Sequence, residues 1–135
     1  MKSLLFCSQA VAPVMLAQGG GAIVHLSSVA ARVNQLSGTG YAVYGALKAG
    51  VDVLTRSMAE EWGPTVRVNA VRSGRIDSGE GPPGSTVPER MAVRLALTAL
   101  GRMGAVDDIA HVVAFLCKRR RSLRYRRRLG RRWRQ

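Results

Sequence analysis

The sequence is poor in cysteine and lacks any apolar run of membrane-spanning length. Cys7 and Cys117 are its two cysteines, and they lie too far apart for a metal-binding or redox motif. We therefore expect both to be buried, reduced side chains of a cytoplasmic protein. Ser8 and Gln9 interrupt the apolar core of the first 18 residues, which favours a helix over a secretory signal. Since no run approaches the ~20 residues of a membrane span, we expect no membrane partner.

Phosphate-binding glycine frames are also absent. Gly19, Gly20 and Gly21 are consecutive, but no GxGxxG or P-loop pattern surrounds them, and they precede a predicted strand instead of following one. We predict a helix stop and a turn there, because glycine readily adopts the left-handed conformation that ends a helix.

Acidic residues are missing from the last 18 positions. Residues 118–135 hold ten Arg and one Lys, so the net charge of +13 falls to +2 for residues 1–117, which have ten basic and eight acidic residues. A dispersed basic surface is therefore not expected, and nucleic acid is not the favoured partner of this body. We predict one domain over 1–117 and a disordered arginine-rich tail over 118–135, with polyanion binding by the tail as an alternative.

Apolar periodicity predicts alternating helices and strands. A helix with a kink or an interruption at Pro13 is expected over the first 18 residues, a buried strand over 22–26, a helix from Tyr44 to about Trp62, and a strand over 65–71. Leu47, Val51, Leu54, Met58 and Trp62 form the predicted apolar stripe of the second helix, and Gly63-Pro64 ends it. Two strands separated by such a helix indicate a right-handed crossover, a parallel sheet and an α/β fold.

The remaining chain is predicted to be less regular. Residues 72–88 contain four Gly and three Pro, so we expect no regular element there. A helical pattern resumes over 89–100, and Gly104 ends a turn. Asp107 and Asp108 lie near the amino end of a last helix, where carboxylates favour the helix dipole.

Tyr44 and Lys48 are the first candidates for chemistry. Four residues of helix return Lys48 to within about 40° of Tyr44, so both project from one face. A neighbouring ammonium favours the phenolate form of a phenol and prepares it for acid/base work. The alternative is that the pair merely caps the core and faces water.

The strand over 22–26 supplies further candidates. Ser27 and Ser28 follow it, at the end where open α/β sheets bind ligands, although serines there also hydrogen-bond turns. His25 lies within the strand without a second metal ligand in view, so a satisfied or partly exposed side chain is favoured over a metal site.

Four segments in this order carry a resemblance to a known family. They are GGGAIVHLSSVA, YAVYGALKAG, VRVNAV with SGRIDS, and LGRMGAVDDIAHVVAFL. Over about residues 1–117 they resemble the carboxyl half of the short-chain dehydrogenase/reductases. The resemblance implies part of a Rossmann-like, doubly wound parallel sheet, an NAD or NADP cofactor, and hydride transfer between nicotinamide and a small carbonyl or alcohol substrate. It also implies homo-oligomers, as in the full-length family.

The resemblance assigns roles residue by residue. Tyr44 would be the general acid/base. Lys48 would bind the nicotinamide ribose and lower the pKa of the tyrosine. Ser28, in preference to Ser27, would hydrogen-bond the substrate oxygen. Tyr41 lies at the expected distance from Ser28 but has Gly45 where the lysine would stand, so Tyr44 keeps the assignment.

The segment SGRIDS resembles the family's P-G-x-x-x-T, with Ser73 in place of the proline. The resemblance implies that Gly74, Ile76 and Ser78 touch the nicotinamide carboxamide, and that Tyr44 and Lys48 share in cofactor binding.

The departures concern both ends. The family's first strand, its glycine-rich phosphate turn, its NAD- or NADP-selecting residue and its catalytic Asn have no counterpart in the sequence. We therefore expect a truncated chain that is inactive alone, with an exposed sheet edge prone to association. After AFLC the basic tail replaces the family ending, and we hypothesise a slip of reading frame that the nucleotide sequence would reveal. A non-catalytic interaction or dimerisation fragment is the alternative function.

Overall fold

The computed structural model describes residues 1–32, 41–79, 88–96 and 98–118, with the backbone alone at positions 89, 90 and 94. The expected order of helix, strand, helix and strand is confirmed. The helices and strands of the described residues are, in chain order, α1 (Lys2–Ala17), β1 (Gly21–Ser28), η1 (Val29–Ala31), α2 (Tyr41–Trp62), β2 (Val66–Ser73), β3 (Ile76–Asp77), α3 (Pro88–Ala96), β4 (Gly104–Ala105) and α4 (Val106–Cys117). Positions 33–40, 80–87, 97 and 119–135 lie outside the described residues, so the disordered tail expected over 118–135 stays a prediction.

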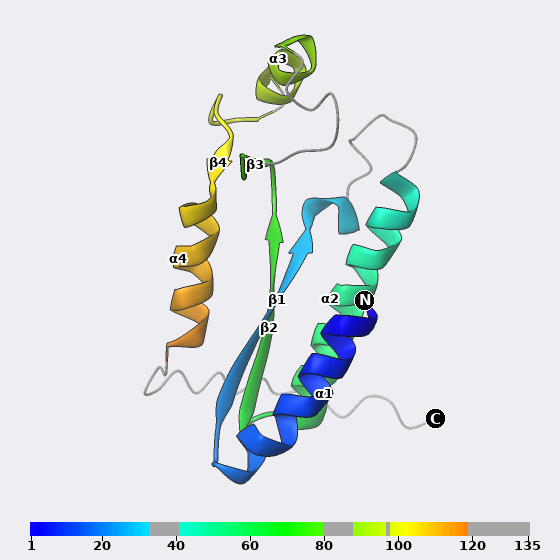
Figure 1. The fold of residues 1–135 in the computed structure, drawn as a ribbon, viewed down its shortest axis with the longest axis vertical. Helices are drawn as coiled ribbons and strands as arrows, with labels where there is room; N and C mark the ends of the chain where they lie inside the picture. Colours follow the sequence, from blue (N-terminus) through cyan, green and yellow to red (C-terminus); the bar gives the residue numbers. More distant parts are fainter. Residues whose placement is uncertain (33–40, 80–87, 97, 119–135) are drawn as a thin grey trace, which may run out of the picture.

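Strands β1 and β2 form a parallel pair, with Gly21 opposite Val66 and Ser28 opposite Ser73. Helix α2 is the crossover between them, as the sequence predicted. Helices α1 and α2 lie on one side of the pair and α4 lies on the other (Figure 1). The described residues therefore form part of a doubly wound α/β sheet, in which the strands are covered on both faces.

The core lies between α1, α2 and the sheet, towards the start of the strands. Its buried members are Ala12, Met58, Trp62, Val66 and Val68. Leu54 packs against this cluster as the stripe on α2 predicts, but Leu47 is 43% exposed. The apolar stripe of α2 is thus buried in its carboxyl half, whereas the half that carries Tyr44 remains accessible.

The three glycines end α1 as predicted. Gly19 has a φ of 76°, and its N–H and that of Gly20 donate to Leu16 and Met15 carbonyls at 3.1 and 2.9 Å. Of the kink or interruption expected at Pro13, the interruption is wrong, because α1 continues through this residue. The carbonyl that loses a helical donor belongs to Gln9, an exposed residue, so water can replace that donor.

Other sequence expectations are corrected by long-range pairing. Strand β1 extends to Ser28 and β2 to Ser73, because their two ends pair with each other. The expectation of no regular element over 72–88 is also wrong, since Ile76 and Asp77 pair in parallel with Gly104 and Ala105. Local composition carries no sign of that partner, which lies almost 30 residues away in the sequence.

The expectation of buried cysteines is wrong as well. Cys7 and Cys117 are both exposed, because each lies on a side of α1 or α4 that the described residues leave uncovered. Within the described parts of the chain, no helix is long and apolar enough to cross a membrane.

Candidate active site

Helix α2 carries Tyr44 and Lys48 on one face. The Lys48 Nζ lies 5.7 Å from the centroid of the Tyr44 ring, as the spacing of four predicts. Tyr41 packs edge-on against Tyr44, with its ring centroid 6.2 Å from that of Tyr44 and the two planes at 84°. Tyr44 is 41% exposed, so its phenol is accessible to a bound molecule.

Two hydrogen bonds join this turn of α2 to the end of β1. Lys48 Nζ donates to the Leu26 carbonyl oxygen at 2.8 Å, and Ser27 Oγ donates to the Lys48 carbonyl oxygen at 3.1 Å. An ammonium has three donors, so this contact leaves Lys48 with two for a ligand. The helix therefore places the ammonium at the carboxyl end of the sheet, where ligands bind in open α/β folds.

Ser28 begins η1 and faces the same end of the sheet. Its Oγ accepts a hydrogen bond from the Ala30 N–H at 3.2 Å, which confirms the alternative that this serine bonds a turn. Among the described residues, no acceptor takes the hydroxyl hydrogen of Ser28, and the residue is 7% exposed. Ser27 is only 2% exposed, and its hydroxyl hydrogen is committed to the helix.

Gly45 brings the tyrosine turn against η1. A Cβ at this position would lie 2.9 Å from the Ala30 carbonyl oxygen, closer than packed atoms tolerate. The missing side chain thus lets the Tyr44 turn approach the turn that Ser28 caps. Sequence reasoning missed this role, although a glycine inside a helix costs about 1 kcal/mol relative to alanine and so signals a packing reason.

Asp52 and Arg72 form an ion pair that sequence reasoning also missed. Arg72 Nε donates to Asp52 Oδ2 at 2.7 Å, and the Asp52 side chain is 8% exposed. Burial acts to raise the pKa of the Asp52 carboxyl, but the Arg72 hydrogen bond, the Ser27 hydroxyl and the charges of Arg72 and Arg56 outweigh it, and the pKa lies below its usual value. The two residues are 20 positions apart, so no local spacing marks them.

The predicted carboxamide-binding segment follows β2. Gly74 has no heavy atom within 4 Å of the place where a Cβ would stand, so its backbone can be approached closely. Ile76 lies in β3, and Ser78 comes two residues later. The structure places four of the predicted site residues near the carboxyl end of β1: Ser27, Ser28, Tyr44 and Lys48. The other three lie after the end of β2, where the chain enters the separate β3–β4 pair: Gly74, Ile76 and Ser78.

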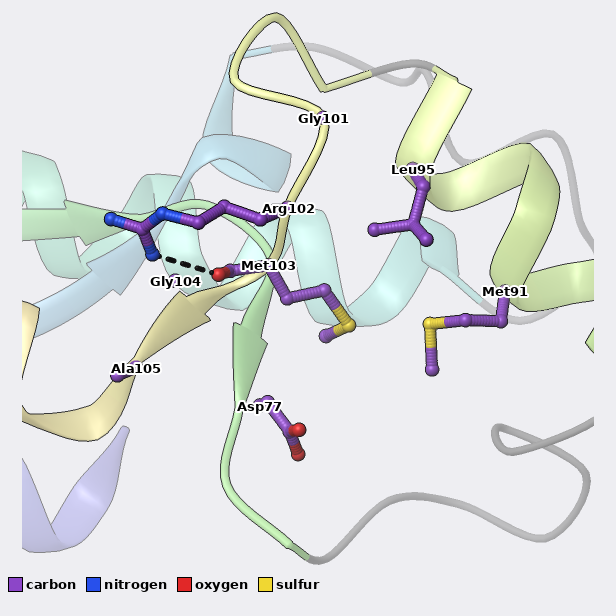
Figure 2. A pocket seen from close by; sticks show the side chains of 8 residues that line it. All are labelled: Asp77, Met91, Leu95, Gly101, Arg102, Met103, Gly104 and Ala105. Carbon is purple, nitrogen blue, oxygen red and sulfur yellow. Dashed lines mark hydrogen bonds between the residues drawn. The ribbon is translucent and has the colours of Figure 1, made fainter.

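A cavity of about 500 Å³ lies beyond that pair, between α3 and the segment leading into β4. Figure 2 shows the side chains of Met91, Leu95 and Met103 along one side and the Asp77 carboxylate on another. Asp77 Oδ1 accepts the Gly79 N–H at 3.1 Å, and Arg102 points away from the apolar side chains (Figure 2). The cavity therefore combines an apolar wall with one carboxylate.

His25 is a satisfied core residue, as expected, and not a ligand. Its Nε2 lies 2.9 Å from Ser8 Oγ, its Nδ1 lies 2.8 Å from Thr55 Oγ1, and burial lowers its pKa. Thr55 donates its one hydroxyl hydrogen to the Val51 carbonyl, so we assign the ring proton to Nδ1. No cluster of three or more metal-ligating side chains occurs in the described ranges.

Comparison with known proteins gives a family match over most of the chain. The family model described as Enoyl-(Acyl carrier protein) reductase matches residues 1–123. A 3alpha-hydroxysteroid dehydrogenase of Mediterraneibacter gnavus is 42% identical over 114 residues, which cover 82% of this chain and 42% of that protein.

Two solved structures give the same result. A short-chain type dehydrogenase/reductase from Mycobacterium ulcerans is 30% identical, with a TM-score of 0.79 over 87% of this chain and 42% of the other. A gluconate 5-dehydrogenase from Burkholderia cenocepacia in complex with NADP and tartrate is 25% identical, with a TM-score of 0.79 over 87% of this chain and 46% of the other.

The chain spans less than half of the length of the curated relatives that it matches. The family model nevertheless covers all of the described residues, including the turns that carry Ser28, Tyr44 and Lys48. This chain belongs to the short-chain dehydrogenase/reductase family.

Proposed function

We propose that this chain supplies the proton-transfer end of an NAD(P)-dependent oxidoreductase site acting on a small carbonyl or alcohol substrate. The observation that supports it best is the joint placement of Tyr44, Lys48 and the turn of Ser28 at the carboxyl end of β1. The match to oxidoreductases, one of them solved with NADP, points to the same chemistry.

The chemistry of each side chain suits its proposed role. The accessible Tyr44 phenol would give a proton to a carbonyl oxygen or take one from an alcohol. The Ser28 hydroxyl, with its hydrogen free among the described contacts, would donate a hydrogen bond to that same oxygen. A nicotinamide bound beside them would exchange the hydride.

The described residues fit the nicotinamide end of a dinucleotide. Lys48 keeps two donors for ribose hydroxyls, and the open backbone at Gly74, followed by Ile76 and Ser78, suits an amide ligand. The consecutive glycines after α1 do not suit the pyrophosphate end. Gly19 and Gly20 precede β1, so about seven residues of strand, roughly 23 Å, separate them from Ser28. They cannot cradle the phosphates of a cofactor held by Lys48.

The function is tested in a chimera, because the sequence has no phosphate-binding turn. Residues 1–117 replace the matching stretch of the Burkholderia cenocepacia gluconate 5-dehydrogenase, whose structure superposes on this chain. We expect saturable NADP binding by the chimera and none by the 135-residue chain. We also expect gluconate-dependent reduction of NADP, followed by NADPH absorbance.

Variants of the chimera identify the acid/base. Tyr44→Phe should lower kcat by about 10²- to 10⁴-fold, the usual contribution of a general acid/base, while Tyr41→Phe keeps the activity. Equal loss in both variants, or full activity of Tyr44→Phe, would contradict the proposal. A fully active chimera would leave the substrate of the native protein to be found by screening carbonyl compounds.

A second candidate is a non-catalytic interaction fragment, and the exposed apolar side chains of α1 favour it. Phe6 is 58% and Val14 is 63% exposed, and on the neighbouring α2 Val53 is 53% exposed. Exposed apolar surface of this kind marks protein contacts. Sedimentation velocity should show association that Phe6→Glu weakens. Val93→Glu, at an equally exposed site on α3, is the matched control, and a monomeric wild-type chain would count against this function.

A further inference from the structure

One turn after Lys48, helix α2 carries a third polar side chain, Asp52, in line with the proposed site residues Tyr44 and Lys48. Asp52 follows Lys48 at the same spacing of four by which Lys48 follows Tyr44, so all three lie along one face of the helix. Unlike the other two, Asp52 is buried, with 8% of its side chain exposed. A buried carboxylate is costly unless it is paired, so its position requires the cation that it has.

That cation comes from the strand that leads into the proposed carboxamide-binding segment. Arg72 is the next-to-last residue of β2, two positions before Gly74. Its Nε donates to Asp52 Oδ2 at 2.7 Å. The contact therefore joins the helix of Tyr44 and Lys48 to the end of β2, at the point where the chain leaves the sheet.

The other connections at this point join β2 to β1, through the strand pairing that ends at Ser28 and Ser73, and not to α2. Ser73 Oγ donates to the Ser27 carbonyl oxygen at 3.4 Å, near the limit of a hydrogen bond. Beyond Ser73 the chain pairs with β4 and no longer with β1. The Arg72 contact is thus a direct polar tether between α2 and the start of the segment.

The geometry of the pair also argues against a purely stabilising role. Arg72 uses Nε and not its paired terminal nitrogens, so the contact has one hydrogen bond and lacks the bidentate form that stabilises most. Asp52 Oδ1 is buried and accepts no hydrogen bond of good geometry in the described residues, because the nearby Ser27 hydroxyl, which helps to lower the pKa of Asp52, donates to the Lys48 carbonyl. An arrangement that leaves a buried carboxylate oxygen unsatisfied sacrifices stability, which is expected where position matters more.

We propose that Asp52 and Arg72 are positioning residues, which hold Gly74, Ile76 and Ser78 at a fixed offset from Tyr44 and Lys48. This rests on the proposed function, because the offset matters only if one cofactor contacts both groups. The pair would set where the nicotinamide carboxamide lies relative to the acid/base, without touching substrate or cofactor itself.

The test is amide hydrogen exchange in the 135-residue chain, measured residue by residue by NMR. Asp52→Asn removes the charge at nearly constant shape. We expect the amides of Gly74, Ile76 and Ser78 to exchange at least about tenfold faster, while those of Val66 and Val68, at the other end of the strand, keep their rates. Glu60→Gln removes the same charge from an exposed position of the same helix and should change neither group.

Two further variants keep the proposal testable if Asp52→Asn does not fold. Arg72→Lys retains the charge but loses the Nε geometry, and should raise exchange at the same three amides by a smaller factor. In the double variant of Asp52→Asn with Arg72→Gln, the three amides should exchange no faster than in whichever single variant exchanges faster, because the two residues act as one unit.

Uniformly faster exchange along all of β2 would show that the pair only stabilises the fold, and would overturn the proposal. Unchanged exchange rates at Gly74, Ile76 and Ser78 in folded variants would overturn it as well. Because no cofactor or substrate enters this experiment, its failure is separate from that of the chimera. An inactive chimera together with the local exchange effect would instead refute the proposed function and keep the tether.

Discussion

Arg67 Nη1 lies 2.6 Å from the carbonyl oxygen of Leu116, 49 residues further along the chain. Its Nη2 also reaches the carbonyl oxygens of Cys117 and Lys118, each at 3.3 Å. The last carbonyls of a helix have no partners within the helix, and a cation near them favours the helix dipole. A single guanidinium on β2 thus caps α4 and attaches it to the sheet.

Replacement of this cap should destabilise the chain. We expect Arg67→Gln to lower the free energy of unfolding by about 1–2 kcal/mol, because charge-assisted hydrogen bonds contribute about 1.5–3 kcal/mol and those at an exposed site contribute less. Urea unfolding followed by circular dichroism measures it. Arg56→Gln, at an exposed position on α2, should stay within about 0.5 kcal/mol of wild type. Equal midpoints for both variants would mean that the cap contributes nothing measurable.

The sequence predicts features that depend on local periodicity. The Tyr44 and Lys48 pair, the stop at Gly19, the parallel crossover and Asp108 at the start of α4 all follow from spacings within one element or between adjacent ones. Asp108 accepts the Ala105 N–H at 2.8 Å, and this bond, with that from Arg102, lowers the pKa of the Asp108 carboxyl. Such features need no knowledge of the tertiary fold.

The features that sequence reasoning missed depend on distant partners. From the sequence alone, Asp52 would be taken for an exposed helix residue, because its partner Arg72 is distant in the sequence. Gly104 was predicted to end a turn, because its pairing with β3 is likewise not visible in the sequence. The burial of Cys7 and Cys117 was mispredicted for a related reason, since a residue's average preference says nothing about which helix side is covered. The roles of Gly74, Ile76 and Ser78 stay predictions.

The buried ring of His25 should make stability depend on pH. Burial lowers the pKa of His25 in the folded chain, so the unfolded chain binds its proton first as the pH falls. The stability from the neutral ring is therefore full above the ordinary value of about 6.5 and declines as the pH drops below it, by at most about 1.4 kcal/mol per pH unit. Protonation would also remove the Nε2 acceptor that the Ser8 hydroxyl uses.

Urea midpoints at about pH 7.5 and 5.5 measure this decline, because carboxylates with lowered pKa values titrate below that window. His25→Gln should remove most of the pH dependence and lower stability at both pH values. His111→Gln, at an exposed position on α4, should retain the wild-type dependence. A dependence that follows His111 instead would refute the assignment to His25.

Two glycines of α2 should respond oppositely to alanine. The new Cβ of Gly45→Ala would lie 2.9 Å from a backbone carbonyl, and such overpacking costs about 1–3 kcal/mol. This exceeds the gain of about 1 kcal/mol in helix propensity, so we expect net destabilisation. The Cβ of Gly50→Ala meets only the flexible end of Met1, with Sδ at 2.7 Å, so this variant should be neutral or more stable. Stabilisation of both variants in urea unfolding would show that η1 moves away from α2 without cost.

Alanine variants of the two serines at the end of β1 should differ in which property they lower: Ser28→Ala mainly kcat, and Ser27→Ala mainly stability. Ser28→Ala would lose the donor that we propose for the substrate oxygen, and loss of one such donor typically lowers kcat by about 10²- to 10³-fold. In the gluconate 5-dehydrogenase chimera we expect a fall of that size, with a loss of about 0.5–1 kcal/mol of stability from the η1 cap.

Ser27→Ala removes a buried hydroxyl that donates to the Lys48 carbonyl, so it should cost about 1 kcal/mol of stability and less than about tenfold in kcat. Kinetics and urea unfolding on the same two proteins give both values. The reverse pattern would move the substrate contact to Ser27, because a hydroxyl committed to the helix in this structure would then have to turn towards the substrate.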